Sequence, residues 1–428
     1  MAEKHRFRKA VCRSLLWAAC LAVPLCGAEA QLLGGLGRLP AVNGLGHTLQ
    51  GTLGDLGNTA ERGLGTLRDA VGRPLAAKRW QRDPQGNPIV RDEVVAVSPT
   101  PASLAAAVKL SFTVARTDSL EPLGLTVVVL HPPQGMTEAD ALAQLRAADP
   151  QGRYDFNHIY NPSGEAVAPS PAVAPSAGAS VRIGMIDGGV DKAHSAFRGV
   201  RIETAGFVGD CKPLPSDHGT EVASLLAASR LYAADVFCGR GEGGSAEAIV
   251  RALGWLAAAK LPVVNVSLAG PPNALLAAGT EAFLKRGAVL VAAAGNDGPA
   301  AGERFPAAYP GVIAVTAVDA ARRIELDAEQ GSYIAFAAPG VKVTAAKAGG
   351  GGAKVTGTSF AAPLVAHRFA LLLAAPNSGG AAWAVCVLRH QAVDLGAPGR
   401  DPVFGYGYLD ATPPSQEIAS PCNGIARQ

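Results

Sequence analysis

The chain has 428 residues, 48% of them hydrophobic and 17% charged, which suffices for a buried core and predicts two or three domains. The net charge of +3 is too small to indicate binding to nucleic acid or to an anionic surface. Aromatic residues make up 5%, and no basic stretch alternates with them, so we expect no nucleic-acid partner.

Residues 1–30 have the pattern of a secretion signal peptide. The basic segment MAEKHRFRKAVCR precedes the apolar segment SLLWAACLAVPLC, and GAEA ends in a pattern of small residues. The apolar segment is too short to span a membrane. We therefore expect cleavage near Ala30 and a secreted or periplasmic protein.

Residues 31–91 read as a spacer rich in glycine and leucine. Within it, residues 45–77 repeat every 11 residues, with apolar positions stepping 4-4-3. This period keeps one apolar stripe on a nearly straight helix, which suits contact with a membrane surface or a partner. Each glycine costs about 1 kcal/mol in a helix relative to alanine. The sequence therefore favours a mobile spacer that becomes ordered only on contact.

Residues 92–162 alternate between strand and helix patterns in the order β-α-β-β-α-β, which predicts a compact, ferredoxin-like α+β unit. The six segments are DEVVAVS, SLAAAVKL, FTVAR, LTVVVLH, TEADALAQLRA and GRYDFNHIY. A threonine precedes the second helix as a plausible N-cap. Residues 163–180 contain mainly alanine, proline and serine, which predicts a linker.

From residue 181 onward, short runs of valine, isoleucine and alanine alternate with amphipathic helical segments. Such runs are typical of strands buried on both faces. We therefore assign residues 181–428 to an α/β domain with a doubly wound, mostly parallel sheet. In such sheets the functional site lies at the carboxyl ends of the strands.

Polar residues stand at several of these strand-to-helix junctions: Asp187, His218, Asn296 and Ser359. Each has a structural alternative. Asp187 and Asn296 are common turn residues, and Ser359 or Thr358 would cap a helix. Together they would bring an acid, a base, a hydroxyl and an amide donor to one edge of the sheet. That combination suits nucleophilic attack on a carbonyl group.

Residues 181–410 resemble the catalytic domain of the subtilisin-like serine proteases. The resemblance is carried by IDGGVD, DHGTEVASLLA, VNVSLAGP, AAAGNDG, PAAYPGVIAVTAV and GTSFAAPLVA, in the order of the family. It implies that Ser359 is the nucleophile, His218 the general base, and Asp187 the residue that orients the imidazole. Asn296 and the Ser359 N–H would stabilise the oxyanion.

The segment 92–162 resembles the propeptide of this family, which chaperones folding and then inhibits by placing its C-terminal tail in the substrate groove. Here YDFNHIY would be that tail. The resemblance thus implies a secreted serine endopeptidase that hydrolyses peptide or protein substrates through an acyl-enzyme and is made as a zymogen. Its maturation site would lie between about Tyr160 and Ser180.

The family pattern also implies a groove that binds substrate as an added strand. One edge would be Ser267, Leu268, Ala269 and Gly270, the other Gly243 and Gly244, and one pocket wall Ala293, Ala294 and Gly295. Arg304 falls near the pocket floor. We hypothesise that it disfavours basic and favours acidic or polar residues before the cut; a solvent-facing arginine is the alternative. No cofactor is expected, and no acidic cluster is clear enough to assign calcium.

The cysteines past the signal peptide are Cys211, Cys238, Cys386 and Cys422. An even number in an exported chain suggests two disulfides, for which three pairings exist. Proximity in the sequence favours Cys211–Cys238 and Cys386–Cys422, and four unpaired thiols are the alternative.

Three positions depart from the family pattern. Gly189 replaces a threonine or serine, Glu221 replaces a frequent second histidine, and ASLLAAS runs into RLYAADV without the usual intervening loop. The missing loop leaves two other functions open. One is a catalytically weak or inactive peptide-binding protein, and the other is a protease limited to self-processing.

Overall fold

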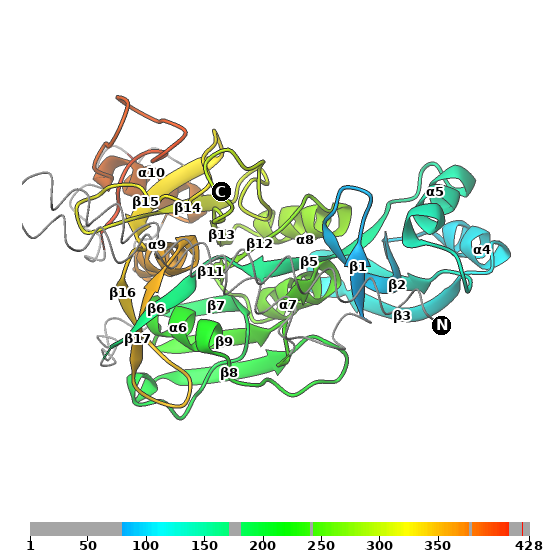
Figure 1. Cartoon of the computed structure of the whole chain (residues 1–428), viewed down its shortest axis with the longest axis horizontal. Coiled ribbons are helices and arrows are strands. Elements are labelled where there is room, and N and C mark those ends of the chain that lie inside the picture. The colour runs from blue at the N-terminus through cyan, green and yellow to red at the C-terminus, as the bar shows by residue number, and fades with distance from the viewer. Residues whose placement is uncertain (1–78, 171–180, 240–242, 376–378, 411–421, 423–428) are drawn as a thin grey trace, which may run out of the picture. The chain divides into compact units, whose positions relative to one another are not determined.

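A computed structural model describes residues 79–170, 181–239, 243–375, 379–410 and 422 (Figure 1). All of them belong to the second of the two units into which the chain divides, Lys78–Gln428. The predicted signal peptide and the 11-residue repeat lie outside the described residues. Within the described ranges, no helix combines the length and apolar character needed to cross a membrane.

The N-terminal α+β unit follows the predicted order of elements, but it begins earlier than residue 92. Its first two strands pair with each other from Trp80 onward, so the predicted spacer ends too late. The predicted strand DEVVAVS covers the second half of β2, whereas β1 and the start of β2 were missed because the turn residues between them resemble a loop. The elements are β1 (Trp80–Arg82), β2 (Pro88–Val97), α4 (Pro101–Lys109), β3 (Thr113–Leu120), η3 (Glu121–Leu123), β4 (Leu125–His131), α5 (Glu138–Ala148) and β5 (Tyr154–Pro162).

The four longer strands of this unit form an antiparallel sheet in the order β5-β2-β4-β3. Thr137 caps α5 as predicted, accepting a hydrogen bond of 3.1 Å from the Asp140 N–H. Alternate residues of each strand point to opposite faces. Val94 of β2 therefore packs against α5, whereas Val95 joins the core formed with α7 (Ala246–Ala258) and α8 (Ala274–Leu284) of the following domain. Both faces of this small sheet are thus buried.

The second domain contains a seven-stranded sheet in the order β15-β14-β13-β11-β7-β9-β8. Every pair of neighbours is parallel, as predicted. The first and last strands in that order, β15 and β8, were not predicted from the sequence. The strands are β7 (Arg182–Asp187), β8 (Arg201–Gly206), β9 (Arg230–Asp235), β11 (Val263–Val266), β13 (Val289–Ala293), β14 (Ile313–Val318) and β15 (Ile334–Pro339).

Helices cover both faces of this sheet, which is the predicted doubly wound arrangement (Figure 1). On β7, Ile183 and Met185 pack toward α6, α9 and α10, whereas Ile186 packs toward α7 and α8. The alternation explains why the strands read as continuous apolar runs. The helices are η4 (Ser195–Phe197), α6 (Asp217–Leu226), α7 (Ala246–Ala258), α8 (Ala274–Leu284), α9 (Thr358–Ala374) and α10 (Ala381–Gln391).

Residues 163–180 are not a linker throughout, as the sequence had suggested. Residues Glu165–Ser170 form strand β6, which pairs with β17 (Gly352–Thr356) in an antiparallel sheet of order β16-β17-β6 (Figure 1). The remaining strand of this sheet is β16 (Val343–Ala346). Proline inside β6 is tolerated because β6 is an edge strand, whose outward N–H groups need no partner in the sheet.

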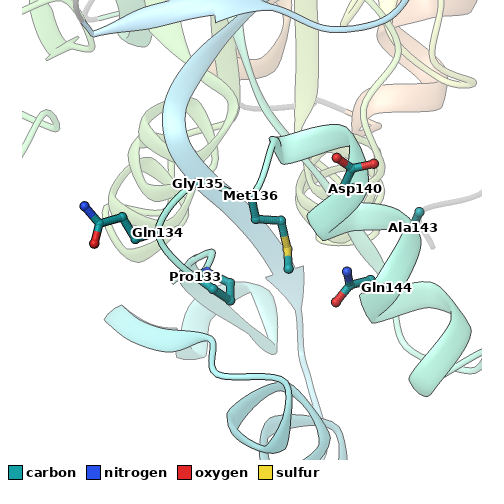
Figure 2. A pocket seen from close by; sticks show the side chains of 7 residues that line it. All are labelled: Pro133, Gln134, Gly135, Met136, Asp140, Ala143 and Gln144. Atoms are coloured by element: carbon teal, nitrogen blue, oxygen red, sulfur yellow. The ribbon is translucent and has the colours of Figure 1, made fainter.

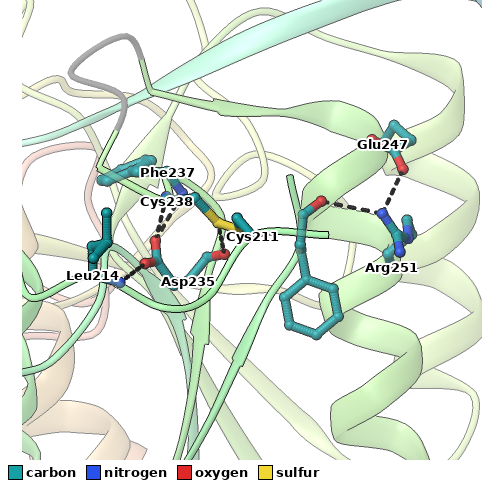
Figure 3. Close-up of a disulfide and its surroundings, with 8 residues drawn as sticks. Cys211, Leu214, Asp235, Phe237, Cys238, Glu247 and Arg251 are labelled. Carbon is teal, nitrogen blue, oxygen red and sulfur yellow. Dashed lines mark hydrogen bonds and ion pairs between the residues drawn. A yellow bond between two sulfur atoms is a disulfide. The ribbon is translucent and has the colours of Figure 1, made fainter. Parts of the chain in front are cut away.

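The structure contains the two disulfides that sequence proximity favoured, with Cα–Cα distances of 6.0 Å for Cys211–Cys238 and 5.9 Å for Cys386–Cys422. The first closes over the carboxyl end of β9, where Asp235 accepts hydrogen bonds from the backbone N–H groups of Leu214 and Cys238 (Figure 3). It therefore fixes the segment between β8 and α6 beside the end of β9.

Phe369 of α9 is fully buried against the sheet, with its ring 6.5 Å from that of Phe336. Phe369→Ala should lower the free energy of unfolding by about 3–5 kcal/mol, because it removes buried apolar area and leaves a cavity. Leu326 is 83% exposed, and Leu326→Ala should change the free energy of unfolding by less than about 0.5 kcal/mol. Urea denaturation followed by fluorescence measures both. Equal losses in the two variants would contradict this packing.

Candidate active site

A hydrogen bond joins Asp187 and His218 at the carboxyl edge of the parallel sheet. Asp187 ends β7 and is fully buried, and its Oδ1 lies 2.9 Å from His218 Nδ1. His218 is the second residue of α6, which Ser216 caps by accepting from the Gly219 N–H. A neutral imidazole that donates from Nδ1 leaves Nε2 unprotonated. Nε2 is buried, and nothing in the described part of the chain hydrogen bonds to it.

Two carboxyl groups set the charge state of His218. Burial of the imidazole opposes its protonation, but the charge of Asp187 and its hydrogen bond outweigh burial, with help from Glu221, and raise the pKa of His218 above 6.5. Glu221 lies one turn further along α6 and is 2% exposed. Burial raises the pKa of Glu221 to about 7, against the opposing attraction of His218. The histidine is therefore flanked by one carboxylate and by a second group that titrates near neutrality.

Ser359 is the second residue of α9, and its hydroxyl lies in the same region. Its Oγ donates to the Ser267 carbonyl at 3.0 Å and accepts from the Ser163 N–H at 2.9 Å. The next residue, Phe360, places its ring centroid 5.3 Å from that of His218. No hydrogen bond joins Ser359 Oγ to His218 Nε2 among these described residues. Proton transfer to the histidine therefore requires the hydroxyl to turn away from the Ser267 carbonyl.

Asn296 follows β13 and is oriented by the start of α9. Its Oδ1 accepts from the Thr358 backbone N–H at 3.1 Å and from the Thr358 hydroxyl at 3.0 Å. This orientation leaves Nδ2 beside Gly357, where a Cβ atom would lie 2.5 Å from Nδ2 and 2.6 Å from the Ser163 carbonyl oxygen. The same oxygen accepts from the Ser359 N–H at 2.9 Å. The Ser163 carbonyl oxygen thus lies beside both groups that the sequence predicts as donors to an oxyanion, the Asn296 amide and the Ser359 N–H.

The chain's own residues 159–164 occupy the groove predicted for substrate. Strand β5 is antiparallel both to β10 (Gly244–Ser245) and to β12 (Leu268–Ala269), so it lies between the two predicted edges. Its register pairs Tyr160 with Gly244, and Asn161 with Ala269.

Tyr160 anchors this segment. The side chain is fully buried, and its hydroxyl donates to the Pro271 carbonyl at 2.8 Å. Its ring lies against Gly270, where a Cβ atom would come within 2.5 Å of the ring. On the other edge, a Cβ atom on Gly243 would lie 2.4 Å from the Tyr160 carbonyl oxygen. Both glycines are therefore required by the close approach of β5.

The predicted pocket floor contains a cluster of charges rather than a lone arginine. Arg304 Nε lies 3.1 Å from Glu329 Oε1, and the guanidinium also pairs with Asp297. Glu329 is fully buried against Gly295, and burial raises its pKa to about 7. The alanines of the predicted wall, Ala293 and Ala294, are fully buried. A preference of Arg304 for acidic residues stays a prediction, but its charge is already paired.

Neither of two other features belongs to this site. Cys386, His390 and Cys422 place ligand-type atoms within 4.8 Å of one another, but the two sulfurs form a disulfide and so do not offer a metal site. A pocket on the N-terminal unit lies between α5 and the preceding loop (Figure 2). It is lined by Pro133, Gln134, Gly135, Met136, Asp140, Ala143 and Gln144. None of the predicted site residues lines it.

Sequence reasoning did not find three participants of this site. Asp235 ends β9 and is the register partner of Asp187. An acidic residue at the end of a strand was the signal that pointed to Asp187, and it could have pointed to Asp235 as well. Glu329 stands in a loop whose sequence carries no recognisable motif. The Ser163–Gly164 peptide was assigned to a linker, because its composition shows no sign of its position.

Comparisons with known proteins agree with this geometry. A model of the Subtilase family matches residues 178–407. Subtilisin from Bacillus pumilus is 33% identical over 215 residues, which cover 46% of this chain and 78% of that protein. The minor extracellular protease Epr of Bacillus subtilis strain 168 is 28% identical over 246 residues, covering 54% of this chain and 38% of Epr.

Among solved structures, fervidolysin from Fervidobacterium pennivorans, a keratinolytic enzyme related to subtilisin, has a TM-score of 0.64 at 19% identity. The alignment covers 77% of this chain and 61% of fervidolysin, and likeness at this identity shows the fold. The family model spans the strands and helices that carry Asp187, His218, Asn296 and Ser359. The chain therefore belongs to the Subtilase family and has its subtilisin-like α/β fold.

Proposed function

We propose that this protein is a serine endopeptidase that hydrolyses peptide bonds through Asp187, His218 and Ser359, and that its first substrate is its own Ser163–Gly164 bond. The observation that carries the proposal is the position of the Ser163 carbonyl. Its oxygen accepts from the Ser359 N–H at 2.9 Å, and the amide of Asn296 lies beside it. Preorganised donors at a carbonyl oxygen stabilise the negative charge that develops there during acyl transfer.

In the first half of the reaction, Ser359 Oγ bonds to the carbonyl carbon of Ser163 while its proton passes to His218 Nε2. Asp187 stabilises the imidazolium that forms. The carbonyl oxygen becomes an oxyanion that accepts from the Ser359 N–H and from Asn296 Nδ2. The intermediate collapses when the bond to Gly164 breaks, and the leaving nitrogen takes the proton from His218.

In the second half, the Ser163 acyl group is esterified to Ser359. Water gives a proton to His218 Nε2 and adds to the ester carbonyl. Collapse of the second tetrahedral intermediate releases the Ser163 carboxylate and returns the proton to Ser359 Oγ. The products are a fragment that ends at Ser163 and a chain that begins at Gly164.

The N-terminal α+β unit would act as a propeptide that inhibits the enzyme until it leaves. Its docking supports this role: Asp155 accepts from the Ala274 N–H at 2.7 Å, at the start of α8, where a negative charge is favourable. Asn273 donates to the Phe156 carbonyl at 2.8 Å. Residues 1–30 would be the signal peptide of this zymogen, and Bacillus subtilis Epr, its relative, is an extracellular protease.

The main alternative is a protein that binds peptides without turning them over, or that processes only itself. Two observations favour it: the Ser359 hydroxyl donates to Ser267 rather than to His218, and only three residues separate α6 from β9. Two assays, self-processing and cleavage of added peptides, distinguish these functions. A protein that binds peptides without turning them over would do neither reaction, whereas a protease limited to self-processing would cleave its own chain but not added peptides.

Full-length wild-type protein should cleave itself, and N-terminal sequencing of the larger fragment should give GEAVAPS. Ser359→Ala should leave the chain intact, because it removes the nucleophile. Ser332→Ala changes an exposed serine and should process at the wild-type rate. A wild-type chain that stays intact, or an intact Ser332→Ala variant, would contradict the proposal.

The peptide IYNPSGEAVAPS, which reproduces residues 159–170, should be cleaved after its first serine, which corresponds to Ser163. Replacing its tyrosine by alanine should lower kcat/KM by about 10–100-fold, because the burial of a large apolar side chain is lost. Replacing its asparagine, which corresponds to the exposed Asn161, should change kcat/KM little. Mass spectrometry of the products locates the cut, and equal effects of the two replacements would sink the assignment of Tyr160 as anchor.

The pH dependence of kcat/KM should report the charge state of His218. Since its pKa is raised above 6.5, activity should fall as the pH drops through that raised value, where the imidazole becomes protonated and stops acting as a base. Glu221→Gln removes a nearby negative charge, so the midpoint of the acid limb should move to lower pH. Rates on the short peptide between pH 5 and 9 measure this. A shift to higher pH would contradict it.

A further inference from the structure

The residues after the Ser163–Gly164 bond leave the site as a strand. Gly164 turns the chain with a φ of 157°, and β6 then runs antiparallel to β17. We propose that the edge of β17 that β6 occupies binds, once β6 has left, the residues that follow the cleaved bond of a substrate, as an added antiparallel strand about seven residues long. The inference rests on the proposed function, because it describes the same site after self-processing.

The register of β6 shows what this surface recognises. It pairs Glu165 with Thr356 at one end and Ser170 with Gly352 at the other. One register shift lies between Lys354 and Val355, which leaves Val167 unpaired and 44% exposed. The strand β16 covers the other edge of β17. A substrate would therefore have a single edge available, and that edge continues from the active site.

Strand β6 is held by its backbone rather than by its side chains. Five of its six residues are exposed, and alanine, proline and glutamate have low strand propensity. The position of β6 therefore depends on its backbone pairing with β17 and on two covalent links, to β5 through Gly164 and to β7 through residues 171–180. Cleavage removes the link to β5 alone, so we expect β6 to leave β17 while staying joined to the catalytic domain, and the N–H and C=O groups of β17 to lose their partners. Such an edge is a template for strand addition.

Proline at position 169 identifies which backbone groups make the contact. Pro169 faces Ala353 but has no N–H, so this pair is a non-hydrogen-bonded one. Hydrogen-bonded and non-hydrogen-bonded pairs alternate in antiparallel sheets. The N–H of Ala168, the fifth residue after the cleaved bond, therefore points toward Lys354. The substrate class is thus an extended polypeptide with a free backbone N–H at its fifth position after the cut.

Internally quenched peptides test this with the self-processed full-length protein. HIYNPS-GE and HIYNPS-GEAVAPS share every residue before the cut and differ only in length after it. The longer peptide should have a kcat/KM about tenfold higher, because several additional backbone hydrogen bonds form. Equal rates would overturn the inference. A slower long peptide would overturn it as well, since that result indicates that β6 still occupies β17.

Two N-methylated versions of the long peptide separate strand pairing from a simple effect of length. N-methylalanine at the fifth residue after the cut should abolish the gain, because it removes the N–H that faces Lys354. N-methylalanine in place of the following proline should keep the gain, since that position has no N–H in β6. If both versions behave alike, β17 does not bind the substrate as proposed.

The short peptide distinguishes failure of this inference from failure of the proposed function. If wild type cleaves HIYNPS-GE and Ser359→Ala does not, the protease function stands whatever the effect of length. If neither peptide is cleaved, the proposed function is contradicted, and this inference is overturned with it.

Discussion

The geometry of the candidate active site depends on the absence of a side chain at Gly357. The carbonyl oxygen of Ser163, Nδ2 of Asn296 and the Cα atom of Gly164 all lie within 2.6 Å of where its Cβ atom would stand. Its φ of 140° also favours glycine over residues with a side chain. Because Gly357 immediately precedes α9, the same position fixes both the hydroxyl of Ser359 and the path of the peptide that crosses it. Any larger residue would displace at least one of them.

Much of this arrangement is predictable from sequence, and the exceptions have physical causes. Asp187, His218 and Ser359 stand at strand or helix ends, where a polar residue interrupts an apolar pattern, and parallel topology brings such ends together. Glu329 gives no such signal, since only the folded chain places it beneath Gly295. Strand β6 was not predicted, because an edge strand held by its backbone needs neither apolar residues nor an alternation of apolar and polar residues. A strand's composition reports side-chain burial, and β6 has little of it.

Two buried carboxyl groups near the site, those of Asp235 and Glu221, differ in their hydrogen bonding. Asp235 is fully buried, yet backbone N–H groups hydrogen bond to both of its oxygens, which opposes the rise in pKa that burial causes. Glu221 has a side-chain oxygen without a hydrogen-bond partner in the described structure, and its pKa reaches about 7. Both lie close to the aspartate–histidine pair. The pKa of Glu221 therefore lies in the pH range in which a histidine base works.

The small N-terminal sheet uses the larger domain as half of its core. One face carries Val94 and Leu130 toward its own helices, while Val95, Val97 and Val129 contact residues of α7 and α8. Once detached, the fragment would present that second apolar face to water, which disfavours its compact state. If this unit is the inhibitor proposed above, separation would leave it poorly folded and open to proteolysis, and its loss would make inhibition irreversible.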